Sequence, residues 1–290
     1  VGTMIYLGDN WPAEYRDHLF THNLHGHQMN HQVNRREGSG YNTVHAGSDM
    51  FYCGDQQYIA VDLQYGPDGA VYISDWYDPR HCHNPNNEQW DRGNGRMYRM
   101  KYDATFTPAR IDYRQVSDIE LVAAQLHPNE WHVRMARLVL AERAVTGNVA
   151  QDAIQKLREI ATTHADETRR LRALWCLHAI DEVDSEIAEK LINDQSEYLR
   201  AWTVQLLAEN MALAGNRKTE ELILNLASRE RSLLVRQYLA SATGRLSKLA
   251  AWTIIEQLAS QSDNAGDRNL PLAIWHQLAQ RMASDLPRAL

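Results

Sequence analysis

The sequence has few cysteines and no closely spaced pair of them, because Cys53, Cys82 and Cys176 stand far apart. Zinc ribbons and covalent haem sites need CxxC-type spacing, so neither is encoded here. With a net charge of -7, the chain also lacks a concentrated basic face, which argues against nucleic acid as the main partner. No apolar run approaches the roughly 18 residues of a membrane helix, so we expect no membrane span. Nor does the sequence contain a GxSxG motif, a P-loop or a dinucleotide fingerprint.

The length of 290 residues exceeds that of a typical single domain, so two domains are expected. The chain begins with Val1 instead of Met, and residues 6–10 already read like the inside of a domain. We therefore expect a fragment of a longer protein, whose N-terminal part, including any export signal, lies outside this sequence.

The first part of the chain, up to about residue 110, reads as strands. Short apolar and aromatic runs are separated by turn signals such as Gly66-Pro67-Asp68-Gly69, and no helical segment lies between them. Such spacing predicts an all-β sandwich, barrel or propeller, without choosing among the three. The predicted strands are residues 4–7, 18–23, 28–33, 60–65, 70–76 and 96–102.

The second part of the chain repeats. Four segments share an apolar residue, an arginine and then an apolar stripe at helical spacing. Their periods of about 28 to 38 residues match helix-pair solenoids of the HEAT or armadillo kind. The four segments begin at Val133-Arg134, Leu171-Arg172, Leu199-Arg200 and Val235-Arg236, and helices are also expected at residues 154–161, 187–192, 220–226, 250–258 and 272–282. We expect the repeat arginines to bond to loop carbonyls or to acidic residues of the next repeat.

Two sets of motifs carry a resemblance to known families. The first comprises Trp11-Pro12, Asn23-Leu24-His25-Gly26, the Gly-Pro-Asp-Gly turn with the strand to Trp76, and residues 95–100. It resembles the last two blades of the soluble quinoprotein glucose and sorbosone dehydrogenase propellers. The second set looks like the large membrane-bound dehydrogenases of planctomycete-type bacteria, which join such a propeller to HEAT repeats. It comprises residues 75–78, 82–83, 90–92, 94–96, 127–131, 140–143, 170–175 and 269–275.

The resemblance implies a fold, an activity and a location. Residues 1–110 would be the C-terminal blades of a β-propeller, and residues 115–290 a HEAT-like α-solenoid that offers a surface to a protein partner. The parent family implies oxidation of a sugar or related alcohol, with pyrroloquinoline quinone or calcium in the parent protein and haem c in a separate domain. It also implies a periplasmic or extracellular location.

The chain departs from this family where the quinone cofactor would be held. His25, Ile59 and Val61 stand where the quinoproteins carry basic residues, and Asp62 alone of that strand motif is retained. A polyanionic quinone would lose most of its charge-assisted anchors. His25, Tyr58 and Asp62 are then candidate substrate or ligand contacts at the propeller mouth. The alternative is a non-catalytic carbohydrate- or protein-binding propeller on a solenoid spacer.

Two polar clusters invite a metal interpretation. On a strand, His25, His27 and His31 would share one face, and imidazole is a common metal ligand. Asp75, Asp78 and His83 are candidate metal ligands, with calcium as the ion that Asp oxygens favour. In the competing interpretation the histidines make only hydrogen bonds, both Asp side chains bind backbone amides, and Trp76 and Trp90 pack beneath the loop.

Overall fold

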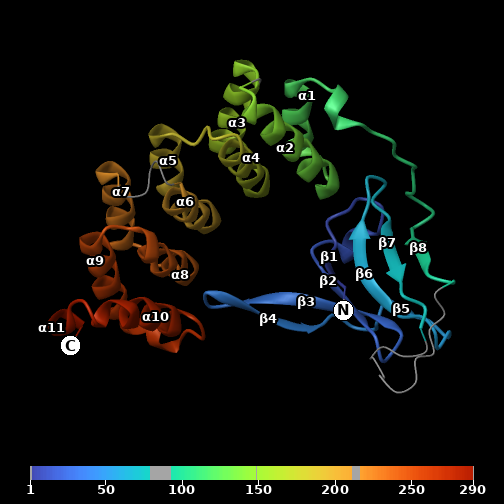
Figure 1. The fold of residues 1–290 in the computed structure, drawn as a ribbon, viewed down its shortest axis with the longest axis horizontal. Helices are drawn as coiled ribbons and strands as arrows, with labels where there is room; N and C mark the ends of the chain where they lie inside the picture. The colour runs from blue at the N-terminus through green and yellow to red at the C-terminus, as the bar shows by residue number, and fades with distance from the viewer. Residues whose placement is uncertain (1, 79–92, 148, 211–215, 290) are drawn as a thin grey trace. The chain divides into compact units, whose positions relative to one another are not determined.

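The computed structural model describes residues 2–78, 93–147, 149–210 and 216–289 (Figure 1). Strands precede helices along the chain, which confirms the mixed, β-then-α fold class. The contacts divide the chain into two compact units, each described by itself below. The first unit comprises Val1–Arg35 and Asn42–Val139, and the second comprises Arg36–Tyr41 and Leu140–Leu290.

The first unit contains two antiparallel sheets, neither of which closes on itself within the described residues. One sheet runs in the order β1-β2-β3-β4 with β5 also paired to β3, and the other in the order β6-β7-β8. The six predicted strands are confirmed, whereas β4 and β5 were not predicted. The strands are β1 (Thr3–Ile5), β2 (Leu19–Asn23), β3 (Gln28–Glu37), β4 (Gly40–His45), β5 (Phe51–Tyr52), β6 (Ala60–Tyr65), β7 (Val71–Asp75) and β8 (Arg96–Met100).

Alternation of side chains along the strands builds the core of this unit. Leu63 and Tyr65 of β6, and Val71 and Ile73 of β7, are buried together with Phe20 of β2. The Gly-Pro-Asp-Gly turn joins β6 to β7, and Gly69 takes the positive φ of 70° that such a turn requires. A side chain at this glycine would also come within 2.5 Å of the backbone nitrogen of Asn10.

The same turn is held by the start of the helical segment. The Asn129 amide donates to the Gly66 carbonyl at 3.0 Å, and the His132 ring lies 2.8 Å from the Pro67 carbonyl oxygen. The Tyr6 hydroxyl donates to the Gly69 carbonyl at 2.8 Å. These bonds satisfy three turn carbonyls, so the turn has a structural role in this unit.

Several helices beyond residue 117 begin at side-chain caps. Side chains of Asp166, Asp184, Ser196 and Ser232 accept hydrogen bonds from first-turn amides, and Pro271 lies at the start of its helix as expected. The helices are α1 (Asp118–Ala123), α2 (Glu130–Val145), α3 (Gln151–Thr163), α4 (Glu167–Ala179), α5 (Ser185–Ile192), α6 (Glu197–Glu209), α7 (Arg217–Ala227), α8 (Leu233–Ala242), α9 (Lys248–Ala259), α10 (Leu270–Met282) and α11 (Leu286–Ala289).

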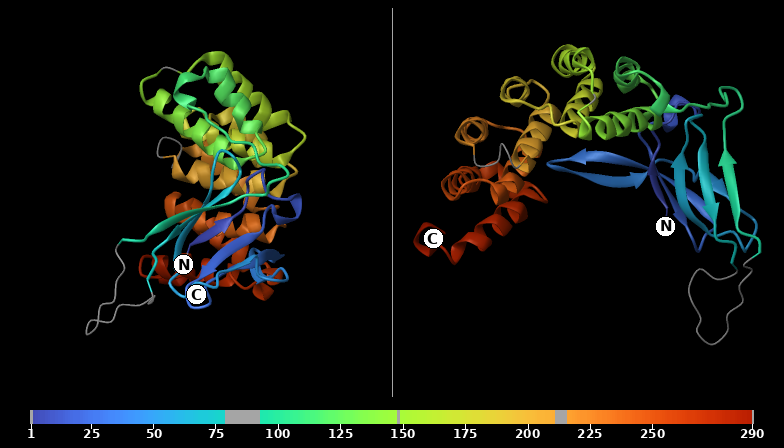
Figure 2. Two further views of the ribbon diagram at one scale, coloured as in Figure 1. Left: turned by 90° about the vertical axis from the view of Figure 1, so that its right-hand side faces the viewer. Right: turned by 45° about the horizontal axis from the view of Figure 1, so that its top comes forward.

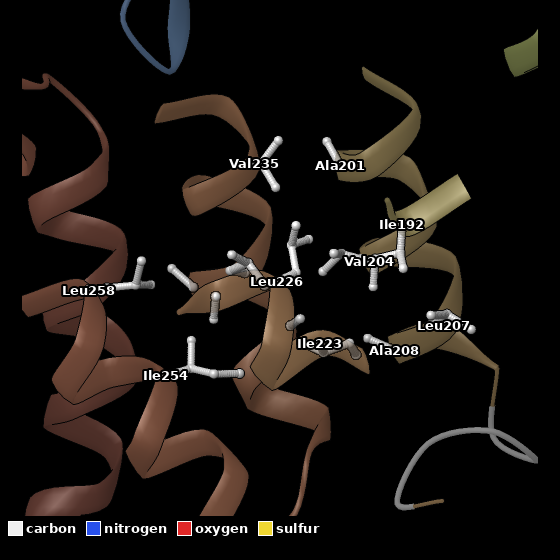
Figure 3. Close-up of a cluster of buried hydrophobic side chains, with 14 of the residues drawn as sticks. Ile192, Ala201, Val204, Leu207, Ala208, Ile223, Leu226, Val235, Ile254 and Leu258 are labelled. Carbon is white, nitrogen blue, oxygen red and sulfur yellow. The ribbon is translucent and has the colours of Figure 1, made fainter. Parts of the chain in front are cut away.

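In the second unit the helices pack in two rows (Figure 2). Helices α3, α5, α7 and α9 contact one another in turn, as do α4, α6, α8 and α10. Figure 3 shows the apolar contacts between rows and neighbours: Ile223 and Leu226 of α7 lie between Val204 of α6 and Leu258 of α9. Each helix thus buries its apolar face mainly against its neighbours.

Arginines at the fourth helical position link successive helices of one row. Arg200 binds both carboxylate oxygens of Glu230, at 2.7 and 2.9 Å, and also the Asp194 carbonyl at 2.8 Å. Arg236 binds the Glu230 carbonyl at 3.0 Å and the Asp263 carboxylate at 2.9 Å. The expected bonds to loop carbonyls and to acidic residues of the next repeat are confirmed for these two arginines.

The predicted repeat register is wrong in two of the four segments. In α4 the arginine that binds the next loop through Asp194 is Arg170, two residues before the predicted position. In α2, Arg134 and Leu138 are exposed, in contrast to the buried pattern of the later repeats. The reason is the neighbour: Arg134 lies over the ring of Tyr65 in the sheet, at 5.7 Å from the ring centre, instead of facing another helix.

Candidate functional site

The three residues predicted to contact a ligand differ in exposure and position. His25 lies exposed in the turn between β2 and β3, where its backbone amide donates to the Asn23 side chain at 3.1 Å. Tyr58 is buried, with only 2 % of its surface exposed. Asp62 lies on the exposed face of β6, and its carboxylate accepts from the Leu63 amide at 2.9 Å. Among the described residues, the hydrogen bonds and ring contacts of Tyr58 involve neither His25 nor Asp62.

Tyr58 belongs to a buried cluster with His22. The Tyr58 hydroxyl and the Nε2 atom of His22 are 3.4 Å apart, and the rings of Phe51 and Tyr98 pack edge-on against Tyr58. Burial raises the pKa of Tyr58, and the nearby Asp75 carboxylate raises it further. Burial also lowers the pKa of His22 to about 4. Both groups are therefore neutral at pH 7, which suits a hydrogen-bonded pair inside a core.

The expectation that His25, His27 and His31 share one strand face is wrong. His25 and His27 lie in a turn, where His27 has a positive φ of 51°, and only His31 lies on a strand. His31 stacks on the Phe20 ring at 4.9 Å, and its Nε2 atom is 2.7 Å from Nδ1 of His18. The turn breaks the alternation that the prediction assumed.

Of the three metal-ligand candidates, His83 lies outside the described residues. Asp75 is buried, and its Oδ1 atom accepts from the backbone amides of Ile59 and Tyr77, both at 2.9 Å. Asp78 is also buried, and its carboxylate is 3.3 Å from the Trp76 indole nitrogen. Over the residues that the structure describes, no group of three or more His, Cys, Asp or Glu side chains could hold a metal ion.

The structure bears in part on the interpretation in which the loop is held by hydrogen bonds and tryptophans. The Asp75 side chain binds backbone amides, as that interpretation requires, and the Asp78 carboxylate accepts from the Trp76 indole. Trp76 is 58 % exposed, and most of the loop beneath which it was expected to pack lies outside the described residues. Trp90 lies outside the described residues.

The positions that would anchor a quinone do not fit one. Ile59 is buried, and its backbone amide is already bound to Asp75. Val61 is half-buried, and its side chain, like that of Ile59, offers no donor to a carboxylate. A polyanionic cofactor needs charge-assisted donors, so these residues provide no such site.

Asp62 instead lines a hollow that was not predicted. The hollow has a volume of about 550 Å³ and is bounded by β1, β6 and the start of α2. Strands β1 and β6 are each the first strand of their sheet. The polar lining residues are Thr3, Asp62, Gln64 and Arg134, and the aromatic ones are Tyr65 and Trp131. The alternation of Asp62 and Gln64 with Leu63 and Tyr65 was visible in the sequence, but the approach of Arg134 from α2 was not.

Residues 1–104 match the family model described as "Domain of unknown function (DUF7133)". Neither the curated proteins nor the solved structures include a match to this chain. Within the described part of the chain, no helix is both long enough and apolar enough to cross a membrane.

Proposed function

We propose that the chain is a non-catalytic binding protein, in which propeller-like blades hold a carbohydrate or protein ligand and a HEAT-like array presents a surface to a protein partner. Its parent would be an exported, periplasmic or extracellular protein of the planctomycete-type membrane-bound dehydrogenase family. The proposal favours binding over sugar oxidation within that family.

The observation that carries this choice is the surroundings of the family's site positions. Ile59 and Val61 give apolar side chains where the quinone's carboxylates would need cations. Tyr58 is buried beside His22 instead of lying open to a substrate. Asp62 is exposed, as is His25, and Asp62 lines the hollow beside β1. A binding role needs only this accessible surface, whereas oxidation would need a cofactor held beside it.

The helical unit supports the scaffold half of the proposal. Its helices contact mainly their neighbours in two rows, as stacked repeats do. The rings of Trp175, Trp202 and Tyr238 follow one another on α4, α6 and α8, with centres 5.0 and 6.1 Å apart. All three are half-buried, so each leaves part of an aromatic side chain accessible. Aromatic side chains of this kind are enriched in protein interfaces.

The proposal is tested by measuring quinone binding and sugar oxidation directly. The 290-residue chain would be titrated with pyrroloquinoline quinone, with and without calcium, by calorimetry. Dye reduction with aldoses would be followed in parallel, with a soluble quinoprotein glucose dehydrogenase as positive control. We expect neither stoichiometric quinone binding nor dye reduction. Tight stoichiometric binding together with sugar-dependent dye reduction would overturn the binding role in favour of the dehydrogenase.

A further inference from the structure

The hollow between β1 and β6 has the lining of a site for a small polar ligand. Its apolar wall is formed by Trp131, which is half-buried, and by Ile5, which is 43 % exposed. Its polar groups are the Asp62 carboxylate, the Gln64 amide and the Arg134 guanidinium. Ligand pockets combine such apolar and aromatic walls with a few polar groups that fix orientation. At about 550 Å³ the hollow is also in the size range of small-molecule sites.

The polar groups keep hydrogen-bonding capacity for a ligand. The Asp62 carboxylate accepts from the Leu63 amide at 2.9 Å and from the Gln64 amide at 3.0 Å, which leaves further acceptor positions on both oxygens. The Arg134 guanidinium lies over the Tyr65 ring, and within the described chain it makes no hydrogen bond or ion pair. Its five N–H donors therefore face solvent or a ligand.

We infer that this hollow binds a neutral saccharide. Asp62 and Arg134 carry opposite charges, so the lining has no net charge that would favour an anion or a cation. A sugar ring has an apolar face that can lie on an aromatic side chain such as Trp131, and hydroxyls that donate to a carboxylate and accept from a guanidinium. The inference rests on the binding role proposed above for the first unit, and it adds the class of ligand and the residues that contact it.

The experiment measures saccharide binding to the whole 290-residue chain. Maltose and cellobiose would be titrated by ligand-observed NMR and calorimetry, with glucuronate, glucosamine and glycine as charged or zwitterionic counterparts. We expect saturable binding of at least one neutral disaccharide and weaker binding of all three counterparts. No saturable binding of either disaccharide, or tighter binding of a counterpart, would overturn the inference.

Matched variants connect the binding to this hollow. Asp62→Asn keeps the shape of an exposed side chain and should weaken the disaccharide about tenfold, because hydrogen bonds to charged groups are the stronger kind. Asp103→Asn makes the same chemical change at an exposed loop position with an 86 % exposed side chain, and should leave the affinity unchanged. Equal affinities for the two variants would overturn the inference.

A second pair of variants tests the aromatic wall. Trp131→Phe keeps a ring and should retain most of the affinity, whereas Trp131→Leu should lose it while the circular dichroism spectrum stays that of the parent chain. If Trp131→Leu does not fold, the Asp62→Asn comparison still decides the matter. Quinone binding would refute the underlying binding role, whereas absent saccharide binding would refute this inference alone.

Discussion

Two buried tyrosines in the first unit differ in whether their hydroxyls have hydrogen-bond partners. The Tyr6 hydroxyl accepts from the amides of Asn10 and Trp11, at 3.0 and 2.7 Å, and donates to the Gly69 carbonyl. The Tyr65 hydroxyl is buried and has no hydrogen-bond partner among the described residues. A buried polar group costs free energy when it lacks a partner, so the two positions should respond differently to removal of the hydroxyl.

We expect Tyr65→Phe to raise the free energy of unfolding by up to about 1 kcal/mol, because it removes an unpaired buried group. Tyr6→Phe should lower it by about 2 kcal/mol, because two amides and a carbonyl lose their partner. Urea unfolding of the full chain, followed by tryptophan fluorescence, compares the two variants. A loss of stability in Tyr65→Phe as large as that in Tyr6→Phe would contradict this account.

His22 should make the stability of the first unit sensitive to acid. Burial lowers its pKa to about 4 from an ordinary value of 6.5, so the unfolded chain takes up the proton first as pH falls. Its contribution to stability is therefore complete above pH 6.5 and is lost as pH falls towards 4, by about 3 kcal/mol in total. In His22→Gln this part of the pH dependence should disappear.

The control for that measurement is exposed His25. Denaturant midpoints between pH 4 and 7 would be compared for the parent chain, His22→Gln and His25→Gln. His25→Gln should keep the slope of the parent chain. A parent-like slope in His22→Gln would show that other groups cause the acid sensitivity.

Residue roles at these positions could be predicted only in part. Tyr58 and the histidines are notable in the sequence, but the pairing of His22 on β2 with Tyr58, just before β6, joins residues 36 positions apart. No local spacing indicates such a contact. The hydrogen bonds of Asp75 could be predicted, because an Asp at a strand end commonly binds nearby backbone amides.

Among the elements, helices with a regular apolar period could be predicted from the sequence, whereas a polar strand could not. The helices of the second unit alternate apolar and polar residues at helical spacing, and the predicted segments lie inside α3, α5, α7, α9 and α10. Strand β4 was missed because its residues are mostly polar and exposed, so no alternation marks it. The register of α4 was wrong because Leu171-Arg172 imitates the motif two residues after Arg170, which makes the inter-repeat bond.

The bond between Arg200 and Glu230 should be a strong link between α6 and the loop before α8. Glu230 is 5 % exposed, and burial raises its pKa while Arg200 and backbone amides lower it overall. Arg200→Met leaves this buried carboxylate without its cation, and we expect about 3 kcal/mol lower stability. The double variant Arg200→Met with Glu230→Gln should recover part of the loss.

The matched control is Arg217→Met in α7. Its guanidinium is 93 % exposed and pairs with Glu221 within the same helix, so its removal should cost less than about 0.5 kcal/mol. Thermal unfolding of the full chain, followed by circular dichroism at a helical wavelength, distinguishes the two. Similar midpoints for Arg200→Met and Arg217→Met would show that the inter-repeat bond is not stabilising.

On the scale of the whole chain, the division into units does not follow the sequence order. The segment Arg36–Tyr41 belongs with the helices, although the residues on both sides of it belong with the sheets. Within the second unit, the amide and hydroxyl of Ser39 donate to the Asp267 carboxylate, at 2.7 and 2.6 Å. This pairing spans 228 positions, and the repeat pattern alone could not predict it.

Asp267 combines this contact with the start of α10, and its loss should destabilise the second unit. Its Oδ1 atom also accepts from the amides of Asn269 and Leu270, at 2.9 and 2.8 Å. Burial raises the pKa of Asp267, but the bonds from Ser39 and these amides lower it to about 2 overall. The stabilisation is therefore complete above pH 3.8 and is lost as pH falls through 2, which corresponds to about 2 kcal/mol.

Asp267→Asn should consequently lower the free energy of unfolding at pH 7 by about 2 kcal/mol, because the amide lacks the charge that its four donors favour. Asp285→Asn is the control, because Asp285 pairs at 3.9 Å with the 61 % exposed side chain of Lys248, where solvent screens the interaction. Hydrogen exchange followed by mass spectrometry would locate the effect. Faster exchange in both residues 36–41 and α10 of Asp267→Asn is expected, since one carboxylate binds both segments. Faster exchange in α10 alone would show that Asp267 acts only as a helix cap.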